Sequence, residues 1–251
     1  MEVIEIQDIK TRVGVASTVR ANDLIPVYVE GVKRFLRDNL SMGEEWVKTA
    51  RGRLYNFSGK SGEGDILGSS ADMGVAIATF FPEFPLITGQ QLLRLYLKIG
   101  NKNPSGHVYI DFGVQINGKP RFNQIQAEIL LKDFKSRGID VGEGRVPDFN
   151  QLRLVADENC GLAYRLAEDV IAENIVAVSA YPFGTRVGKD GLFGAYLDGD
   201  GSWYAIVGGL PSSGSVGQMV RYDTKGVVPK KLDTSSDNLV DKLTRDFIKR
   251  F

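Results

Sequence analysis

The chain has very few of the residues on which covalent and metal-based chemistry most often depends. It contains a single cysteine, Cys160, and a single histidine, His107. One cysteine excludes a disulfide bond within the chain, and two residues cannot supply the roughly four Cys or His ligands of a structural zinc site. A triad that needs histidine would have to use His107, and thiol catalysis would have to use Cys160. We interpret both residues as incidental rather than catalytic.

The chain also lacks a charge bias and a long apolar run. Lys and Arg together number 31, as do Asp and Glu, so the formal net charge is zero. This argues against non-specific binding to nucleic acid or to a membrane surface, although a local basic patch stays open. The longest apolar run, 73–81, is about half of the roughly 20 residues that span a bilayer. We therefore expect no membrane partner.

The first ten residues, MEVIEIQDIK, are acidic where a secretion signal would be basic and then apolar. The sequence therefore predicts a soluble, cytoplasmic protein. Export without such a signal, or a viral origin, would leave the same pattern. An apolar content of 43% with 25% charged residues is ordinary for a folded globular protein.

The N-terminal part has helical periodicity. Apolar residues recur at helical spacing after Pro26, and again from Ser41 to about Tyr55. Ser41 and Glu44 have the spacing of a capping box, which predicts the start of the second helix. The glycine-rich stretch 56–70 that follows is typical of a loop.

From residue 71 onward the pattern changes to the period of two that strands show. The predicted strands are 73–81, 91–99, 107–116, 151–156, 175–183 and 219–222. Helices are predicted at 123–137 and 236–251. We therefore predict an α+β fold, a mainly antiparallel sheet with flanking helices. Residues 1–70 would form a helical N-terminal section with its glycine-rich loop, not necessarily independent, and residues 71–251 the α+β core domain.

The stretch Leu192–Gly209 organises the C-terminal half of the chain. Two short apolar and aromatic runs flank Asp-Gly-Asp-Gly, which predicts a β-hairpin with this tetrad as its turn. An EF-hand would need a Glu twelve positions along, where Gly209 stands. Tyr196 and Tyr204 fall on one face of the hairpin, where they would meet a partner if exposed.

Several aspartates lie on or near predicted strands. If some converged, they could hold Mg²⁺ for phosphodiester chemistry, in which the metal activates water. The candidate ligands are Asp111, Asp157, Asp198 and Asp200. An exposed, polar sheet face is the simpler explanation. In the strand 107–116, the alternation puts Asp111 and Gln115 on the outward face.

The two N-terminal helices carry basic residues that would meet phosphates if they shared a face. They are Lys33, Arg34, Arg37, Lys48, Arg51 and Arg53. Residues 138–200, by contrast, contain eleven acidic and five basic residues. This asymmetry suits head-to-tail self-association as well as it suits nucleic acid. A solvated helix face remains the simplest interpretation.

No complete catalytic motif is present. Gly59-Lys60-Ser61 lacks the earlier glycine of a phosphate-binding loop, because Leu54 occupies that position. The first hypothesis is therefore a non-catalytic binding or self-assembly protein that forms homo-oligomers and needs no cofactor. An alternative is a Mg²⁺-dependent, nuclease-like enzyme that uses the aspartates. A second alternative is a nucleic-acid-binding module that uses the basic helices.

Overall fold

The structure, a computed structural model, describes six stretches of the chain. They are residues 16–54, 71–80, 108–181, 187–197, 203–208 and 217–222. The predictions for the loop 56–70, the strand 91–99 and the helix 236–251 lie outside the described residues.

Two helices form the N-terminal part, as predicted. Helix α2 (Ala21–Asp38) begins before Pro26, and helix α3 (Glu44–Leu54) follows the short turn η1 (Leu40–Met42). Ser41 lies inside that turn, so the predicted capping box is wrong. The chain changes direction at Gly43, which has a φ of 92°, and the Gly43 carbonyl accepts from the Val47 amide at 3.1 Å. A positive φ of this kind favours glycine.

The predicted strand 73–81 is wrong, because Ala71–Phe80 forms helix α4. Three consecutive residues, Val75, Ala76 and Ile77, are each 0% exposed. A helix that is buried on every side has no polar face, so its sequence shows no helical period. A continuous apolar run of this length fits a buried strand equally well.

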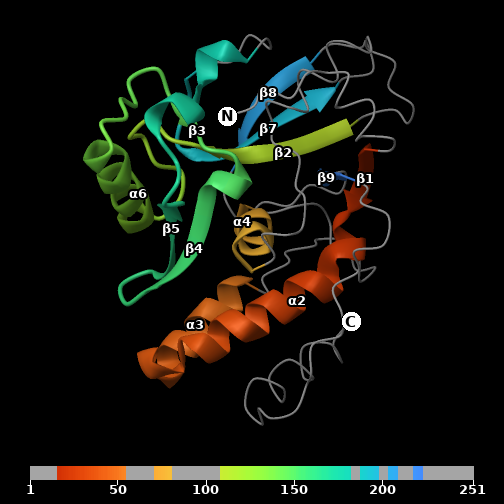
Figure 1. Cartoon of the computed structure of the whole chain (residues 1–251), viewed down its shortest axis with the longest axis vertical. Coiled ribbons are helices and arrows are strands. Elements are labelled where there is room, and N and C mark those ends of the chain that lie inside the picture. The colour runs from red at the N-terminus through yellow and green to blue at the C-terminus, as the bar shows by residue number, and fades with distance from the viewer. Residues whose placement is uncertain are drawn as a thin grey trace.

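The described residues include a five-stranded sheet, and its strand order is β1-β9-β2-β7-β8 (Figure 1). The strands are β1 (Ala16–Arg20), β2 (Val108–Gln115), β7 (Gly191–Leu197), β8 (Trp203–Gly208) and β9 (Gly217–Tyr222). All neighbours are antiparallel except β2 and β9. The fold is therefore α+β with mainly antiparallel strands, as predicted.

The predicted hairpin is present as β7 and β8. Leu197 pairs with Trp203 at its closed end, and Tyr196 is in register with Tyr204. Because paired residues share a face of the sheet, the two tyrosines lie on one face, as the alternation predicted. The Asp-Gly tetrad between the strands lies outside the described residues.

Two further strand pairs flank the sheet. Strands β4 (Leu152–Asp157) and β5 (Gly161–Leu166) form an antiparallel hairpin, and β3 (Arg145–Val146) pairs with β6 (Val176–Ala177). The predicted strand 175–183 is therefore too long. After β6 the chain enters the turn η4 (Val178–Ala180). The buried side chains that suggested a strand belong partly to this turn.

Helix α6 (Gln124–Ser136) confirms the prediction for residues 123–137. The Asn123 side chain caps it by accepting from the Ile125 amide at 2.9 Å. Such a cap satisfies one of the free amides at a helix N-terminus. The helix packs against β5 at the side of the molecule away from α2 (Figure 1).

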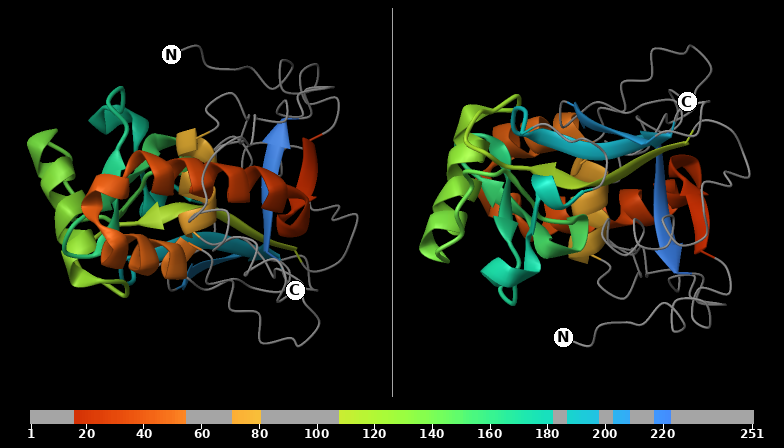
Figure 2. Two further views of the ribbon diagram at one scale, coloured as in Figure 1. Left: turned by 90° about the horizontal axis from the view of Figure 1, so that it is seen from below. Right: turned by 90° about the horizontal axis from the view of Figure 1, so that it is seen from above.

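One continuous core joins these elements, with α4 between α2 and the β4–β5 hairpin (Figure 2). It contains side chains from both sides of residue 70, among them Leu36, Ile77 and Leu154. The degree to which residues 1–70 are independent stays a prediction. Among the described residues, the helices are too short or too polar to cross a membrane.

Candidate functional site

The most elaborate polar arrangement in the described structure joins α3, α4 and β5. Arg53 on α3 binds the carboxylate of Asp72 on α4 through two bonds. Its Nε lies 2.8 Å from Oδ2, and its Nη2 lies 2.6 Å from Oδ1. The side chain of Asp72 is only 4% exposed and that of Arg53 is 22% exposed. This fork-shaped ion pair is the geometry that arginine and carboxylate favour.

Tyr164 on β5 completes this cluster, which we call the Arg53–Asp72–Tyr164 cluster. Its hydroxyl donates to Asp72 Oδ1, and the Arg53 guanidinium lies 5.7 Å from the centre of its ring. Burial, followed by the charge of Asp72, holds the pKa of Tyr164 well above its usual value. Burial alone would lower the pKa of Arg53, but the charge of Asp72 and its hydrogen bonds raise it. Arg53 and Tyr164 therefore keep one protonation state near neutral pH.

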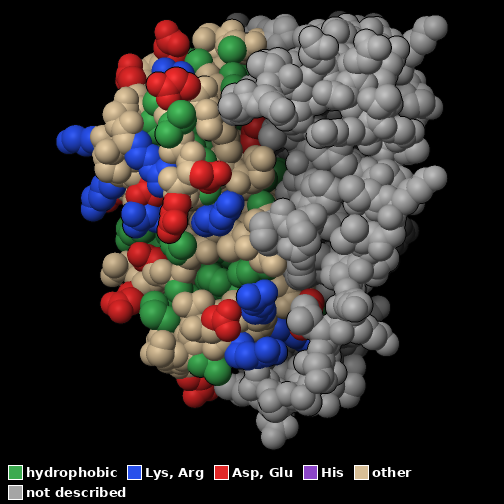
Figure 3. Space-filling view, viewed as in Figure 1, with side chains coloured by type: hydrophobic (Ala, Val, Ile, Leu, Met, Phe, Trp, Pro, Cys, Tyr) green, Lys and Arg blue, Asp and Glu red, His purple; other side chains and the backbone are tan. Residues whose placement is uncertain are grey.

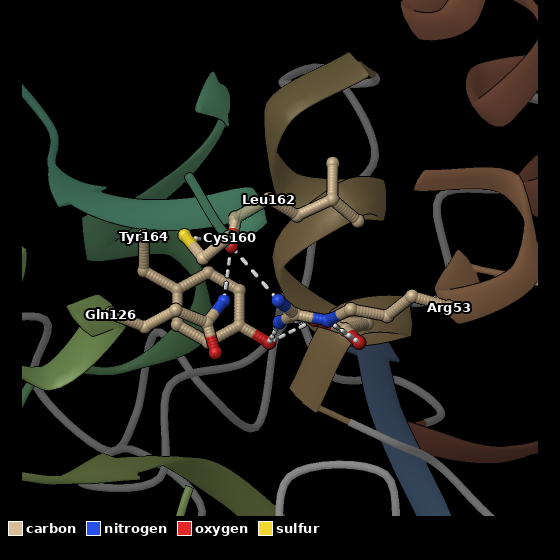
Figure 4. Close-up of polar contacts among 6 residues, drawn as sticks. Arg53, Gln126, Cys160, Leu162 and Tyr164 are labelled. Carbon is tan, nitrogen blue, oxygen red and sulfur yellow. Dashed lines mark hydrogen bonds and ion pairs between the residues drawn. The ribbon is translucent and has the colours of Figure 1, made fainter. Parts of the chain in front are cut away.

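The same arginine also binds a backbone carbonyl at the outer edge of β5. Arg53 Nη1 donates to the Leu162 carbonyl at 2.8 Å, and the Gln126 amide from α6 donates to that same oxygen (Figure 4). Further along, the Leu166 amide donates to Asp133 Oδ2 at 3.0 Å. Each of these backbone groups points away from β4, so the side chains take the place of a third strand.

The opposite edge and the turn of the hairpin are held in the same way. On β4, the Leu154 amide donates to the Thr79 hydroxyl of α4 at 2.9 Å. At the turn, the indole of Trp46 donates to the carbonyls of Asp157 and Gly161 at 3.1 and 2.8 Å. Since an unpaired strand edge invites pairing with another chain, these contacts both anchor and protect the β4–β5 hairpin.

Cys160, the single cysteine, belongs to this turn. Its thiol donates to Asp157 Oδ1 at 3.2 Å and to the Leu162 carbonyl at 3.3 Å. Burial, and then the hydrogen bond and charge of Asp157, raise the pKa of Cys160 to about 12. A thiol is a nucleophile only as the thiolate, so this environment supports the structural interpretation.

The four aspartates predicted as magnesium ligands are only partly described. Asp157 ends β4, and its Oδ1 accepts from the amides of Asn159 and Cys160 at 2.9 Å. Asp111 lies on β2 in register with Gly194. Asp198 and Asp200 lie outside the described residues. Within the part of the chain that the structure describes, no three His, Cys, Asp or Glu side chains gather as a metal site. The Mg²⁺ site stays a prediction.

The six basic residues lie on α2 and α3, but they differ in burial and in the groups that they bind. Arg53 is taken into the buried cluster, and Lys48 bonds Glu44 and Glu45 at 3.1 and 2.8 Å. Arg34 lies 3.9 Å from Asp38. The other three, Lys33, Arg37 and Arg51, lie on the same two helices. On the face shown in Figure 3, basic and acidic side chains alternate over the described surface. Nucleic-acid binding stays a prediction.

Sequence reasoning missed Asp72, Tyr164 and Gln126. One signal was available, because Asp72 directly precedes the apolar run that forms most of α4. A carboxylate beside such a run is buried only when it is paired. Comparison of the chain with protein-family models, with curated proteins and with solved structures finds no match.

Proposed function

We propose that the protein is a non-catalytic, self-assembling protein whose copies associate through the outer edge of β8. The observation that carries the proposal is the place of β8 in the sheet. It is the end strand, and among the described residues its only strand neighbour is β7.

The composition of β8 supports pairing with another chain. Its residues, WYAIVG, include no charged residue and no proline. Edge strands that do not pair with another chain usually carry a charged residue, a proline or a bulge, which prevents pairing. Elsewhere this chain protects its strands, since side chains from the three helices α3, α4 and α6 occupy both edges and the turn of the β4–β5 hairpin. β8 has no comparable protection among the described residues.

Two copies that meet at β8 would form one continuous sheet. An antiparallel β8–β8 contact is symmetric, because each copy offers the same strand to the other. Main-chain hydrogen bonds would supply much of the affinity, as in other strand additions. Tyr196 and Tyr204, which the sequence predicts as partner-binding residues, pair with each other in the register of β7 and β8.

The chemistry of the buried polar groups supports a non-catalytic protein. Arg53, Asp72 and Tyr164 bind one another and the backbone of β5. The thiol of Cys160 is held protonated by its surroundings. These groups stabilise the fold, and each is already engaged by other protein groups.

Sedimentation velocity over a wide range of protein concentrations tests the proposal. We expect the sedimentation coefficient to rise with concentration. Ala205→Lys and Ile206→Lys put a charge on the two faces of β8, and either should weaken association at least roughly tenfold, which is about 1.4 kcal/mol. Circular dichroism and the Tm of each variant would show that it is folded.

Thr18→Lys is the matched control, because β1 is the other end strand of the sheet. It should leave the association constant unchanged. A strictly monomeric parent chain at every concentration would refute the proposal. So would folded β8 variants that associate as tightly as the parent, since the contact would then lie elsewhere.

A further inference from the structure

Gln115, near the end of β2, has a fully buried amide without a hydrogen bond. The residue is 0% exposed, and within the described part of the chain neither Oε1 nor Nε2 has a hydrogen-bond partner. Buried polar groups are almost always satisfied, by protein or by ordered water, because leaving them unpaired is costly. The Gln115 amide is therefore expected to have a hydrogen-bond partner other than the described protein groups.

The strand register explains why no neighbouring side chain reaches it. Gln115 faces away from the main core, in which Val114 and Ile116 are buried. Its partner on β7 is Gly191, which has no side chain. On its other side, the bridges Gly113–Asp148 and Ile116–Arg145 place Val146 opposite Gln115. Both lateral neighbours are thus unable to donate or accept through a side chain.

A cover over this face of the sheet removes it from solvent. Phe193 of β7 pairs with Gly113 and so shares the face of Gln115. Its ring lies 4.8 Å, centre to centre, from that of Tyr181, which follows the turn η4. Phe193 is 0% exposed and Tyr181 is 3% exposed. The sequence correctly put Gln115 on the face away from the core, but the expectation of a solvent-facing side chain is wrong.

Two further polar groups lie on the same face of the sheet or in its cover, and we call this region the Gln115 compartment. Asp148 is bridged to Gly113 on the Gln115 face and is only 2% exposed. Burial, and then the charge of Asp148, raise the pKa of Tyr181 well above its usual value, so Asp148 lies within electrostatic reach of that phenol. The compartment therefore combines an amide, a carboxylate and a phenol with the apolar walls of Val146 and Phe193.

We propose that this compartment is an internal binding site for one ordered water molecule, held by the Gln115 amide. Water is the small ligand that can both donate to Oε1 and accept from Nε2. Buried waters in globular proteins characteristically bridge polar groups that would otherwise lack partners. Gly191, the β7 partner of Gln115, places no side chain where the water would lie.

Water-proton relaxation dispersion of the full chain, which detects long-lived internal water, tests this site. Gln115→Met keeps the size of the side chain and removes both polar atoms, so we expect the loss of one long-lived water. Gln126→Met is the matched control. Gln126 is also a buried glutamine, but its amide already donates to the Leu162 carbonyl, so its replacement should leave the internal water unchanged.

The Tm of the Gln115→Met variant tests the proposal independently. If water satisfies the amide, Gln115→Met should leave the Tm equal or lower. A clear rise in Tm would mean that the amide is unsatisfied, and would overturn the proposal. Should the variant not fold, a crystal structure of the parent chain decides. Water density beside both Gln115 atoms supports the site, whereas a direct protein partner or empty density overturns it.

Discussion

Removal of the Asp72 carboxylate should destabilise the protein strongly. In Asp72→Ala, the guanidinium of Arg53 loses its ion-pair partner, and the Tyr164 hydroxyl loses its acceptor. Breaking one partner of a buried ion pair costs about 3–5 kcal/mol. Because the Arg53 side chain is 22% exposed and can be partly rehydrated, we expect the lower end, about 3 kcal/mol. Urea unfolding at neutral pH measures the change directly.

Two control variants make the interpretation specific. Lys48→Ala removes exposed ion pairs with Glu44 and Glu45, so it should leave the urea midpoint nearly unchanged. The double variant Arg53→Met with Asp72→Leu leaves no unpaired charge, and should be more stable than Asp72→Ala. A loss below about 1 kcal/mol in Asp72→Ala would refute the reasoning, as would a double variant less stable than that single one.

Three further predictions follow from buried or crowded groups. Burial raises the pKa of Asp190 above its usual value, despite opposing backbone hydrogen bonds, so the folded chain binds this proton more tightly than the unfolded chain. Stability should therefore fall as pH rises above about 4, and a Tm–pH profile of Asp190→Asn should lack that component. The pKa of Cys160, raised from 9.0 to about 12, lowers its thiolate fraction about 1,000-fold, so thiol labelling at about pH 8 should be far slower in the folded chain than in denaturant. Gly113→Ala should destabilise the protein by more than about 1 kcal/mol, because its Cβ would overlap the Pro147 carbonyl. Gly52 on α3 has open space around it, so Gly52→Ala should stabilise the protein by about 0.5–1 kcal/mol. A variant with the same urea midpoint as the parent chain would contradict its prediction.

The sequence alone determined the elements whose patterns are local. Helices α3 and α6 each have a polar and an apolar side, so the helical period is visible in the residues. The hairpin β7–β8 follows from alternation on both sides of a turn sequence. In α3 and α6 one face is buried and the other is polar, which leaves a readable period in the chain.

The local sequence pattern did not predict the structure where an element is buried on most sides. It also did not predict burial where a distant segment of the chain covers the element. α4 shows no helical period because residues 71, 72 and 74–78 are all buried. Gln115 was correctly assigned to the face away from the core, yet the distant η4–Tyr181 segment covers that face. Alternation reports which residues share a face, and it carries no information about what packs over that face.

The candidate site depended most on the tertiary structure. From sequence, Arg53 was one of six basic residues on two amphipathic helices. In the fold it binds Asp72, 19 residues away, and the β5 residue Leu162, 109 residues away. No spacing rule connects such positions, because only packing of α3, α4 and β5 brings them together. The sequence by itself determined which residues could carry charge, and the tertiary structure decided which charges are buried, paired and structural.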